Sequence, residues 1–297
     1  SYAIQKNDII ELVKKYSFIF LVAFLIFIFL KPTTSGGNDI HSVITYNIKY
    51  DDNSNGENSW NVRKAALLEL ITTFSPDIIG IQEGLIHQVE FLDSEMNDYR
   101  YVGVGRDDGN RKGEYCAIFF NVKKYKLLKN STFWLSERPN EVSIGWDAAL
   151  ERICTYALLE TINGGNKIWV FNTHFDHVGN IAREESARLL LEKIKMLNIQ
   201  EEPVLVMGDF NALEKSKVID ILRQSLNDTM RDADIEHKGP IGTFNNFLNN
   251  QEIIKRIDYI FSKGFQTISH QHVDKKLDNG NHISDHLPVF VKVKVIR

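Results

Sequence analysis

Short polar motifs recur along this chain, and four of the five stand at the end of a hydrophobic run. Each of those runs is short, apolar and rich in β-branched or aromatic residues, which is typical of strands buried on both faces. Polar residues just past the carboxyl ends of buried strands are where α/β folds place their sites. The runs are 43–46, 78–81, 168–171 and 204–207, and the motifs are Thr45-Tyr46-Asn47, Gln82-Glu83, Asn172-Thr173-His174, Gly208-Asp209-Phe210-Asn211 and Ser284-Asp285-His286. We therefore expect a layered α/β domain whose strand ends meet at one rim.

Together the motifs supply carboxylates, carboxamides and histidines, a set that suits hydrolytic chemistry. A carboxylate beside an Asn carbonyl offers the oxygen ligands that Mg²⁺ or Mn²⁺ prefers. A histidine or carboxylate at hydrogen-bond distance from a water could take its proton. Asp209 and Asn211 are two residues apart, so in an extended segment their side chains share a face. The pattern predicts a metal-dependent hydrolase of phosphoesters.

The same motifs resemble those of the endonuclease/exonuclease/phosphatase superfamily, in the family's order, from about Ile40 to the C-terminus. The most specific are Gly-Asp-Phe-Asn at 208–211 and Ser-Asp-His-Leu-Pro at 284–288, with Arg-Ile-Asp-Tyr-Ile at 256–260 between them. Further matches at 134–137, 145–149 and 172–177 are similar to a secreted bacterial branch related to the deadenylase-like members. The resemblance implies an α/β four-layer sandwich of two packed mixed β-sheets flanked by helices.

The resemblance also assigns expected roles to individual residues. The metal, Mg²⁺ or Mn²⁺, would be held by Glu83, Asn47 and Asp285, and catalysis would use His286, Asp258, Asp209, Asn211 and His174. Asp258 is expected to orient His286 and favour its charged form. Arg152, Asp176 and His177 are expected to bind substrate, although a salt bridge for Arg152 and a scaffold role for the other two stay open. Lys49 departs from the DNA-repair nucleases of the superfamily, which have an acidic residue there.

A hydrophobic segment precedes the catalytic domain and suggests export from the cytoplasm. Residues 18–30 are thirteen apolar residues between Lys14-Lys15 and Lys31-Pro32, and we expect a helix over about 16–30. Thirteen residues span ~20 Å as a helix, short of a ~30 Å hydrocarbon core, so a signal peptide and a signal anchor both fit. The predicted organisation is a segment 1–39 with this helix and a linker, then a catalytic domain 40–297. Either reading predicts a secreted or membrane-anchored, extracytoplasmic protein.

Between the motifs, apolar residues at helical spacing predict helices at 62–74 and 183–197, and residues 290–296 read as a closing strand. Cys116 and Cys154 sit in strand-like surroundings, so two buried thiols are expected, with a disulfide left open. The net charge of −4 and pI near 6.2 argue mildly against a general nucleic-acid binder.

Three functions compete. The first is a phosphodiesterase or phosphatase acting on a small molecule or a lipid headgroup, with an activated water attacking phosphorus. The second is an extracellular or membrane-tethered nuclease, and the third is a catalytically inactive binding module tethered to a membrane. The presence of Asp209, Asn211 and His286 argues against the third. We expect the protein to be a monomer whose partners are a phosphoester substrate and, through the N-terminal segment, a membrane.

Overall fold

The computed structural model describes residues 40–231 and 235–296. The segment predicted as a signal or anchor falls in residues 1–39, outside this range. Within the described residues, no helix combines the length and the apolar character that a bilayer crossing needs. The chain from Ile40 onward forms one compact unit, and the fold below is the fold of that unit.

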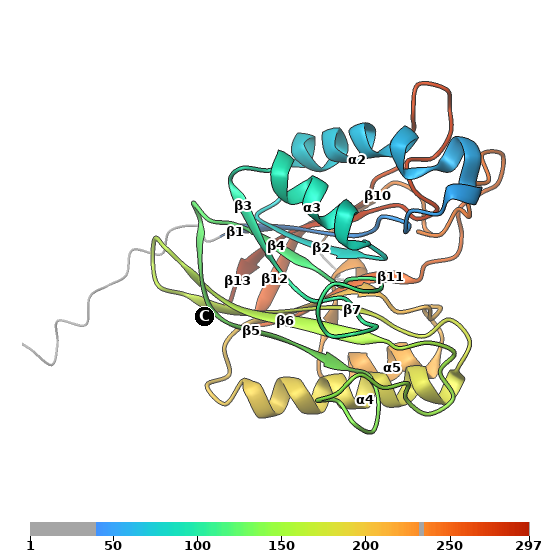
Figure 1. The fold of residues 1–297 in the computed structure, drawn as a ribbon. Coiled ribbons are helices and arrows are strands. Elements are labelled where there is room, and N and C mark those ends of the chain that lie inside the picture. The colour runs from blue at the N-terminus through green and yellow to red at the C-terminus, as the bar shows by residue number, and fades with distance from the viewer. Residues whose placement is uncertain (1–39, 232–234, 297) are drawn as a thin grey trace, which may run out of the picture. The chain divides into compact units, whose positions relative to one another are not determined.

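Two mixed sheets form the centre of this unit (Figure 1). The seven-stranded sheet has the order β10 (His237–Lys238), β12 (Phe265–His272), β13 (Val289–Val295), β1 (Ile40–Asn47), β2 (Ile78–Gln82), β4 (Ile118–Asn121), β3 (Tyr99–Val102). The six-stranded sheet has the order β5 (Tyr125–Trp134), β6 (Ile153–Thr161), β7 (Lys167–His174), β8 (Val204–Asp209), β11 (Asp258–Lys263), β9 (Asn227–Asp228). Each sheet mixes parallel pairs, such as β1 with β2 and β7 with β8, with antiparallel ones.

Helices cover the outer face of each sheet (Figure 1). Helices α2 (Trp60–Phe74) and α3 (Ile86–Glu95) lie on the seven-stranded sheet, and α4 (Asn180–Leu197) and α5 (Lys217–Arg223) lie on the six-stranded sheet. Two short 3₁₀ helices, η1 (Asn53–Asn58) and η2 (Thr229–Arg231), complete the elements. The predicted four-layer sandwich is therefore confirmed, and both predicted helices are present. They begin two and three residues earlier than the apolar spacing indicated.

Three apolar layers hold the sandwich together. Ile44, Ile79 and Leu67 belong to the layer between the seven-stranded sheet and its helices, and Phe171 and Leu190 to the corresponding layer on the other side. The middle layer joins the sheets and includes Val43, Ile78, Ile118, Val170, Leu205 and Ile260. Since strands β2 and β8 are buried along their whole length, their runs are apolar without alternation. The two cysteines are free and buried, as the strand-like surroundings predicted.

A polar bridge crosses the middle layer next to the site. The Gln82 side-chain amide donates to Asn172 Oδ1 at 2.6 Å, and the Asn172 amide donates to the carbonyls of Ile81 and Ala117. Both side chains are fully buried, and these hydrogen bonds replace bonds to water that burial removes. The bridge fixes the ends of β2 and β7 against each other. Two carboxamides of the sequence motifs thus serve the scaffold and do not line the site.

Candidate active site

Strand register brings the ends of five strands to one rim. Asn47 at the end of β1 pairs with Gln82 at the end of the parallel strand β2. His174 at the end of β7 pairs with Asp209 at the end of β8, and Asp258 at the start of antiparallel β11 faces Asp209 from the other side. Because the two sheets pack face to face, both rows of polar residues open on the same end of the sandwich.

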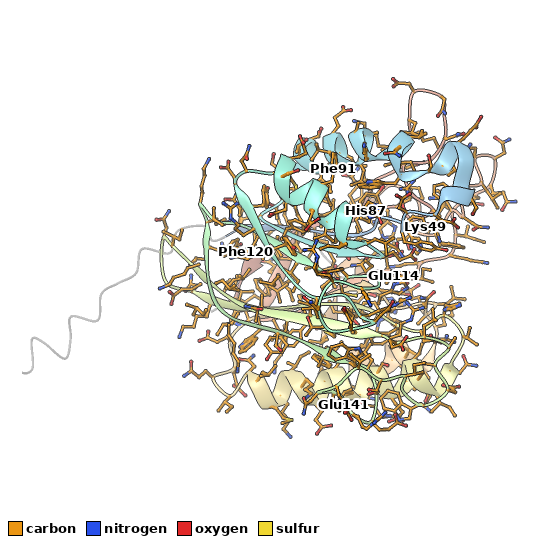
Figure 2. The ribbon with its side chains drawn as sticks, viewed as in Figure 1. Lys49, His87, Phe91, Glu114, Phe120 and Glu141 are labelled. Carbon is orange, nitrogen blue, oxygen red and sulfur yellow. The ribbon has the colours of Figure 1, made fainter. Side chains whose placement is uncertain are left out.

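A cavity of about 800 Å³ lies over this rim. The predicted residues that line it are Glu83, Arg152, His174, His177, Asp209, Asn211, Asp285 and His286. Asn47 and Asp258 lie directly behind the lining, buried and hydrogen-bonded to it. Lys49 and Glu114, both labelled in Figure 2, also line the cavity. Asp176 is the one predicted site residue that neither lines the cavity nor contacts Asp209, Glu83 or Asp285.

Asp209 is the centre of the polar network. Its Oδ2 accepts a hydrogen bond from Asn47 Nδ2 at 3.1 Å and lies 3.4 Å from His174 Nε2 and 3.7 Å from His286 Nε2. Burial, and then the nearby charge of Asp258, raise the pKa of Asp209 to about 7. A carboxylate with such a pKa gives up and takes up a proton readily near neutral pH, which suits a general base.

Asp258 and His286 form a buried pair beside Asp209. Asp258 Oδ2 lies 2.8 Å from His286 Nδ1 and also accepts a hydrogen bond from the Thr243 hydroxyl at 2.5 Å. Burial by itself lowers the pKa of His286, but the charges of Asp258 and Asp209 outweigh it and raise that pKa to about 10. The ring is therefore an imidazolium at neutral pH, with its Nε2 proton directed toward the cavity side of the pair.

Glu83 and Asp285 converge on one cationic position. Lys49 Nζ lies 3.5 Å from Glu83 Oε2 and 3.4 Å from Asp285 Oδ2. Glu83 Oε1 accepts from Asn47 Nδ2 at 2.9 Å, which holds that carboxylate in place. Burial would raise the pKa of Glu83, yet Lys49 and Asn47 bring it below its usual value, so the group stays charged. Two carboxylates fit a hard divalent cation such as Mg²⁺ or Mn²⁺. Asn47 presents its Nδ2 to Glu83, while its Oδ1 accepts the backbone N–H of Lys49.

A second grouping of ligand atoms exists nearby. Carboxylate oxygens of Asp209 and Asp258 and a ring nitrogen of His286 all lie within 4.8 Å of one another. A cation there would compete with the proton that gives His286 its positive charge, so the Glu83–Asp285 position is the better site for a metal ion. The two positions are adjacent, because Asn47 Nδ2 contacts both Glu83 and Asp209.

His174 and Asn211 lie on the other side of Asp209. Asn211 Nδ2 donates to the Phe175 carbonyl at 3.0 Å and lies 3.1 Å from His174 Nε2. Burial, and then the charges of Arg152 and Arg106, hold the pKa of His174 well below its usual value. Asp209 is thus flanked by one neutral histidine and one charged histidine, in positions that predict different roles.

Arg152 lines the cavity and has one guanidinium nitrogen without a partner in the described part of the chain. Its Nη2 lies 2.9 Å from His177 Nδ1 and its Nε 3.4 Å from Asp176 Oδ2, whereas its buried Nη1 has no hydrogen-bond partner among the described residues. Asp176 also accepts the backbone N–H groups of Val178 and Gly179. The arrangement places Asp176 as the residue that orients Arg152 at the cavity wall.

The sequence from residue 44 to 286 matches the model of the Endonuclease/Exonuclease/phosphatase family. The chain belongs to this family. Known members of similar sequence include an uncharacterized protein of Acanthamoeba polyphaga mimivirus, 29% identical over 78% of this chain and 91% of the relative. A mannosyl-6-phosphatase from Bacteroides thetaiotaomicron has a solved structure that superposes with a TM-score of 0.81 at 33% identity. That superposition covers 85% of this chain and 99% of the phosphatase.

A third similar protein is named as an exoribonuclease subunit. The CCR4-Not complex 3'-5'-exoribonuclease subunit Ccr4 of Mycosarcoma maydis is 24% identical over 65% of this chain, and the match covers 37% of that protein. The chain therefore spans about a third of this relative's length. These relatives establish a phosphoesterase and nuclease family, and with it hydrolase activity on phosphoester bonds.

Several cavity residues of this family member had no signal in the sequence. Phe244 packs edge-on against the His286 ring with centroids 5.0 Å apart, and Thr243 holds Asp258. Arg106 and Lys255 add positive charge to the lining, and Arg106 Nη1 lies 2.7 Å from Glu114 Oε2. Thr243 and Phe244 belong to a Gly-Thr-Phe-Asn turn with no hydrophobic run before it. Only the pairing of Phe244 with His286, which the sequence does not indicate, brings this turn to the site.

Proposed function

We propose that this protein is a divalent-metal-dependent hydrolase of small phosphoesters, a phosphatase or phosphodiesterase of sugar phosphates or of lipid headgroups. The observation that carries the proposal is the convergence, in one cavity, of a paired-carboxylate cation position with the Asp209–His286–Asp258 network. Membership of the family supports the reaction class.

In this proposal the chain's own residues divide the work between proton transfer and charge stabilisation. Asp209 takes the proton of the water that attacks phosphorus, while the imidazolium of His286 donates a hydrogen bond to a phosphoryl oxygen. Asn211 would turn one N–H from His174 Nε2 to the charge that develops on another oxygen, and His174 would position that amide. Glu83 and Asp285 would hold the cation, with Asn47 orienting Glu83, and the cation would polarise the phosphoryl group. Arg152, at the cavity wall, then fixes the orientation of the phosphate.

The size and charge of the cavity support a small anionic substrate. About 800 Å³ is within the range of small-molecule sites, and the lining includes Lys49, Arg106, Arg152 and Lys255. Lys49, Arg106 and, through its Nε, Arg152 already face acidic partners. Lys255 and the remaining nitrogens of Arg152 are left to bind the substrate's phosphate. The name of the similar Bacteroides thetaiotaomicron protein, a mannosyl-6-phosphatase, favours phosphorylated sugars as the first class to test.

A nuclease is the second candidate, motivated by the exoribonuclease relative. The net charge of −4 gives no general attraction for a polyanion, and recognition of nucleic acid would have to come from the rim. A non-catalytic binding module is the least compatible with the site, because every group that the chemistry needs is in place around the cavity.

A substrate panel tests the proposal directly. Residues 40–297 and Asp209→Asn would be assayed with hexose phosphates, glycerophosphodiesters, a nitrophenyl phosphodiester and a single-stranded RNA, each with Mg²⁺, Mn²⁺ or EDTA. We expect the highest kcat/KM on a small phosphoester, dependence on added metal, and loss of turnover in Asp209→Asn. Turnover of RNA alone would replace the proposal with the nuclease, and metal-independent turnover would contradict the metal mechanism.

A further inference from the structure

A cluster of three histidines lies at one edge of the seven-stranded sheet, away from the cavity. His270 and His272 are two residues apart on β12 and therefore point to the same face. The short strand β10 pairs in parallel with β12 and places His237 beside His270. His270 and His272 are buried and His237 is half-buried. One ring nitrogen from each histidine lies within 4.8 Å of the other two, and none of the three lines the cavity.

A single backbone carbonyl fixes the protonation of two of these rings. Pro240 O lies 3.0 Å from His237 Nε2 and 2.7 Å from His272 Nδ1. Since a carbonyl can only accept, both of those nitrogens carry the proton, and in the neutral rings His237 Nδ1 and His272 Nε2 keep their lone pairs. Hydrogen bonds of this kind, from the non-ligating nitrogen to a carbonyl, orient histidines that bind metal ions in proteins.

The turn that carries Pro240 is built for close approach. Gly239 has φ +91°, in the region that favours glycine, and a Cβ there would lie 2.0 Å from the carbonyl oxygen of His272. Any larger residue would therefore push the turn away from β12. Glycine at this position lets the Pro240 carbonyl reach both rings.

His237 Nδ1 and His270 Nδ1 share one hydrogen bond, and the other two ring nitrogens of the cluster have none within the described part of the chain. His270 Nε2 and His272 Nε2 are buried and have no hydrogen-bond partner among the described residues, although a buried polar atom without a partner is costly. Burial, together with neighbouring positive charge, lowers the pKa of both rings, to about 3 for His272. Arg256 is one of those neighbours, but its guanidinium is paired with both carboxylate oxygens of Asp228 at 2.9 and 2.6 Å.

We propose that His237, His270 and His272 together bind one Zn²⁺ ion, with water as the fourth ligand. Three neutral imidazoles and no carboxylate suit Zn²⁺ and not the hard cation expected in the cavity. His237 Nδ1 and His270 Nδ1 are 3.0 Å apart in a hydrogen bond, and two ligands of a tetrahedral zinc ion are about 3.3 Å apart. Zinc would replace the proton of this hydrogen bond, and the neutral His270 ring would then carry its proton on Nε2. The ion would tie the two-residue strand β10 to β12 and so close this edge of the sheet.

Zinc content separates this site from the cavity. Residues 40–297 would be stripped with chelator, loaded with Zn²⁺, passed through a desalting column in Mg²⁺ and analysed for metal by mass spectrometry. The set comprises the wild type, His270→Gln, His237→Gln, Glu83→Gln in the cavity and His87→Gln as a matched histidine control on an exposed surface. The Co²⁺-loaded forms would be examined for the visible absorption of tetrahedral cobalt, and thermal unfolding would be followed with and without Zn²⁺.

We expect one zinc per chain in the wild type, Glu83→Gln and His87→Gln, and less than a tenth of that in His270→Gln and His237→Gln. Zn²⁺ should raise Tm only in the first three proteins, because a ligand stabilises the state that binds it. If His270→Gln does not fold, the half-buried His237→Gln decides the result. Retention of zinc by a folded His237→Gln variant, its loss in Glu83→Gln, or no zinc in the wild type would overturn the proposal and leave a cluster of neutral, hydrogen-bonded histidines.

Discussion

His286 in the cavity and His272 at the sheet edge are both almost fully buried, yet their pKa values move in opposite directions. Burial lowers both, but Asp258 and Asp209 reverse the effect at His286 and raise its pKa to about 10. His272 faces other histidines and Arg256 without a carboxylate, and its pKa falls to about 3. The same side chain is therefore a fixed cation in one place and a neutral lone-pair donor in the other. The neighbouring carboxylates, and not the degree of burial, decide which.

The largest expected effect comes from removing the imidazolium of His286. His286→Ala should lower kcat/KM by roughly 100- to 1,000-fold, the range for loss of one group that stabilises a transition state. Asp258→Asn should cost less, because the ring remains but loses the partner that keeps it charged. If the two residues act as one unit, the double variant is barely worse than His286→Ala.

The double-mutant cycle would be measured as kcat/KM on the best substrate of the panel, with His87→Gln as the control. Additive losses across the cycle would show that Asp258 and His286 act separately. The contrast between the two buried histidines would then have no bearing on catalysis.

The next effect tests whether turnover depends on a metal ion bound at Glu83 in the cavity. Glu83→Gln keeps the shape of the side chain but removes a charge that Mg²⁺ needs, so activity at low Mg²⁺ should fall roughly 10- to 100-fold and recover partly at high Mg²⁺. A Mg²⁺ titration of both proteins measures this. Full activity of the wild type in EDTA would rule out the metal mechanism.

A pH series sharpens the comparison of the two histidines in protein freed of metal. Because the pKa of His272 is lowered on folding, its contribution to stability is present above its unfolded pKa of about 6.5 and is lost as the pH falls toward 3. One such proton changes the free energy of unfolding by at most about 1.4 kcal/mol per pH unit. For His286, with its raised pKa, stability is instead lost as the pH rises from about 6.5 through about 10.

Urea unfolding at several pH values would compare the wild type with His272→Gln and with His87→Gln. The slope between pH 6.5 and 4 should be shallower in His272→Gln and unchanged in His87→Gln. An identical slope in all three proteins would mean that His272 keeps an ordinary pKa in the folded state.

The smallest effect concerns Lys49, the cation that shares Glu83 and Asp285. A bound metal ion must displace this ammonium, so Lys49→Met should lower the Mg²⁺ concentration for half-maximal activity by a few-fold. The conservative variant Lys49→Arg keeps the charge and serves as the control. A weaker response to Mg²⁺ in Lys49→Met would show that the lysine assists the metal site and does not compete with it.

The layered fold and most of the cavity were predictable because each part has a local signal. A buried strand announces itself as an apolar run, and Asn47, Glu83, His174 and Asp209 stand directly after such runs. Parallel register aligns these side chains within each sheet, and the packing of the two sheets brings them to one cavity, with Asn47 just behind its lining. Their catalytic and metal-binding roles remain predictions, which the variants above would test.

The contacts that the sequence did not indicate depend on pairings between distant segments. Gln82 and Asn172 stand at strand ends like the site residues, and only the packing of the sheets shows that they bridge the interior. His237 lies in a two-residue strand with no apolar run, and its place beside His270 comes from a pairing across more than thirty residues. The residues of one buried strand do not indicate which strand it will pair with.

Three residues that line the cavity, Lys49, Glu83 and Asn211, have φ values of 56°, 60° and 47°. Side chains with a Cβ rarely adopt this backbone, which costs on the order of 1–3 kcal/mol at each position. Selection of random variants for heat resistance alone should therefore accept glycine at these three positions. Glycine in place of Glu83 or Asn211 should give more heat-resistant proteins that turn over substrate poorly. Thermal stability and catalysis are therefore opposed at Glu83 and Asn211. A thermostable version of this hydrolase has to be engineered elsewhere in the chain.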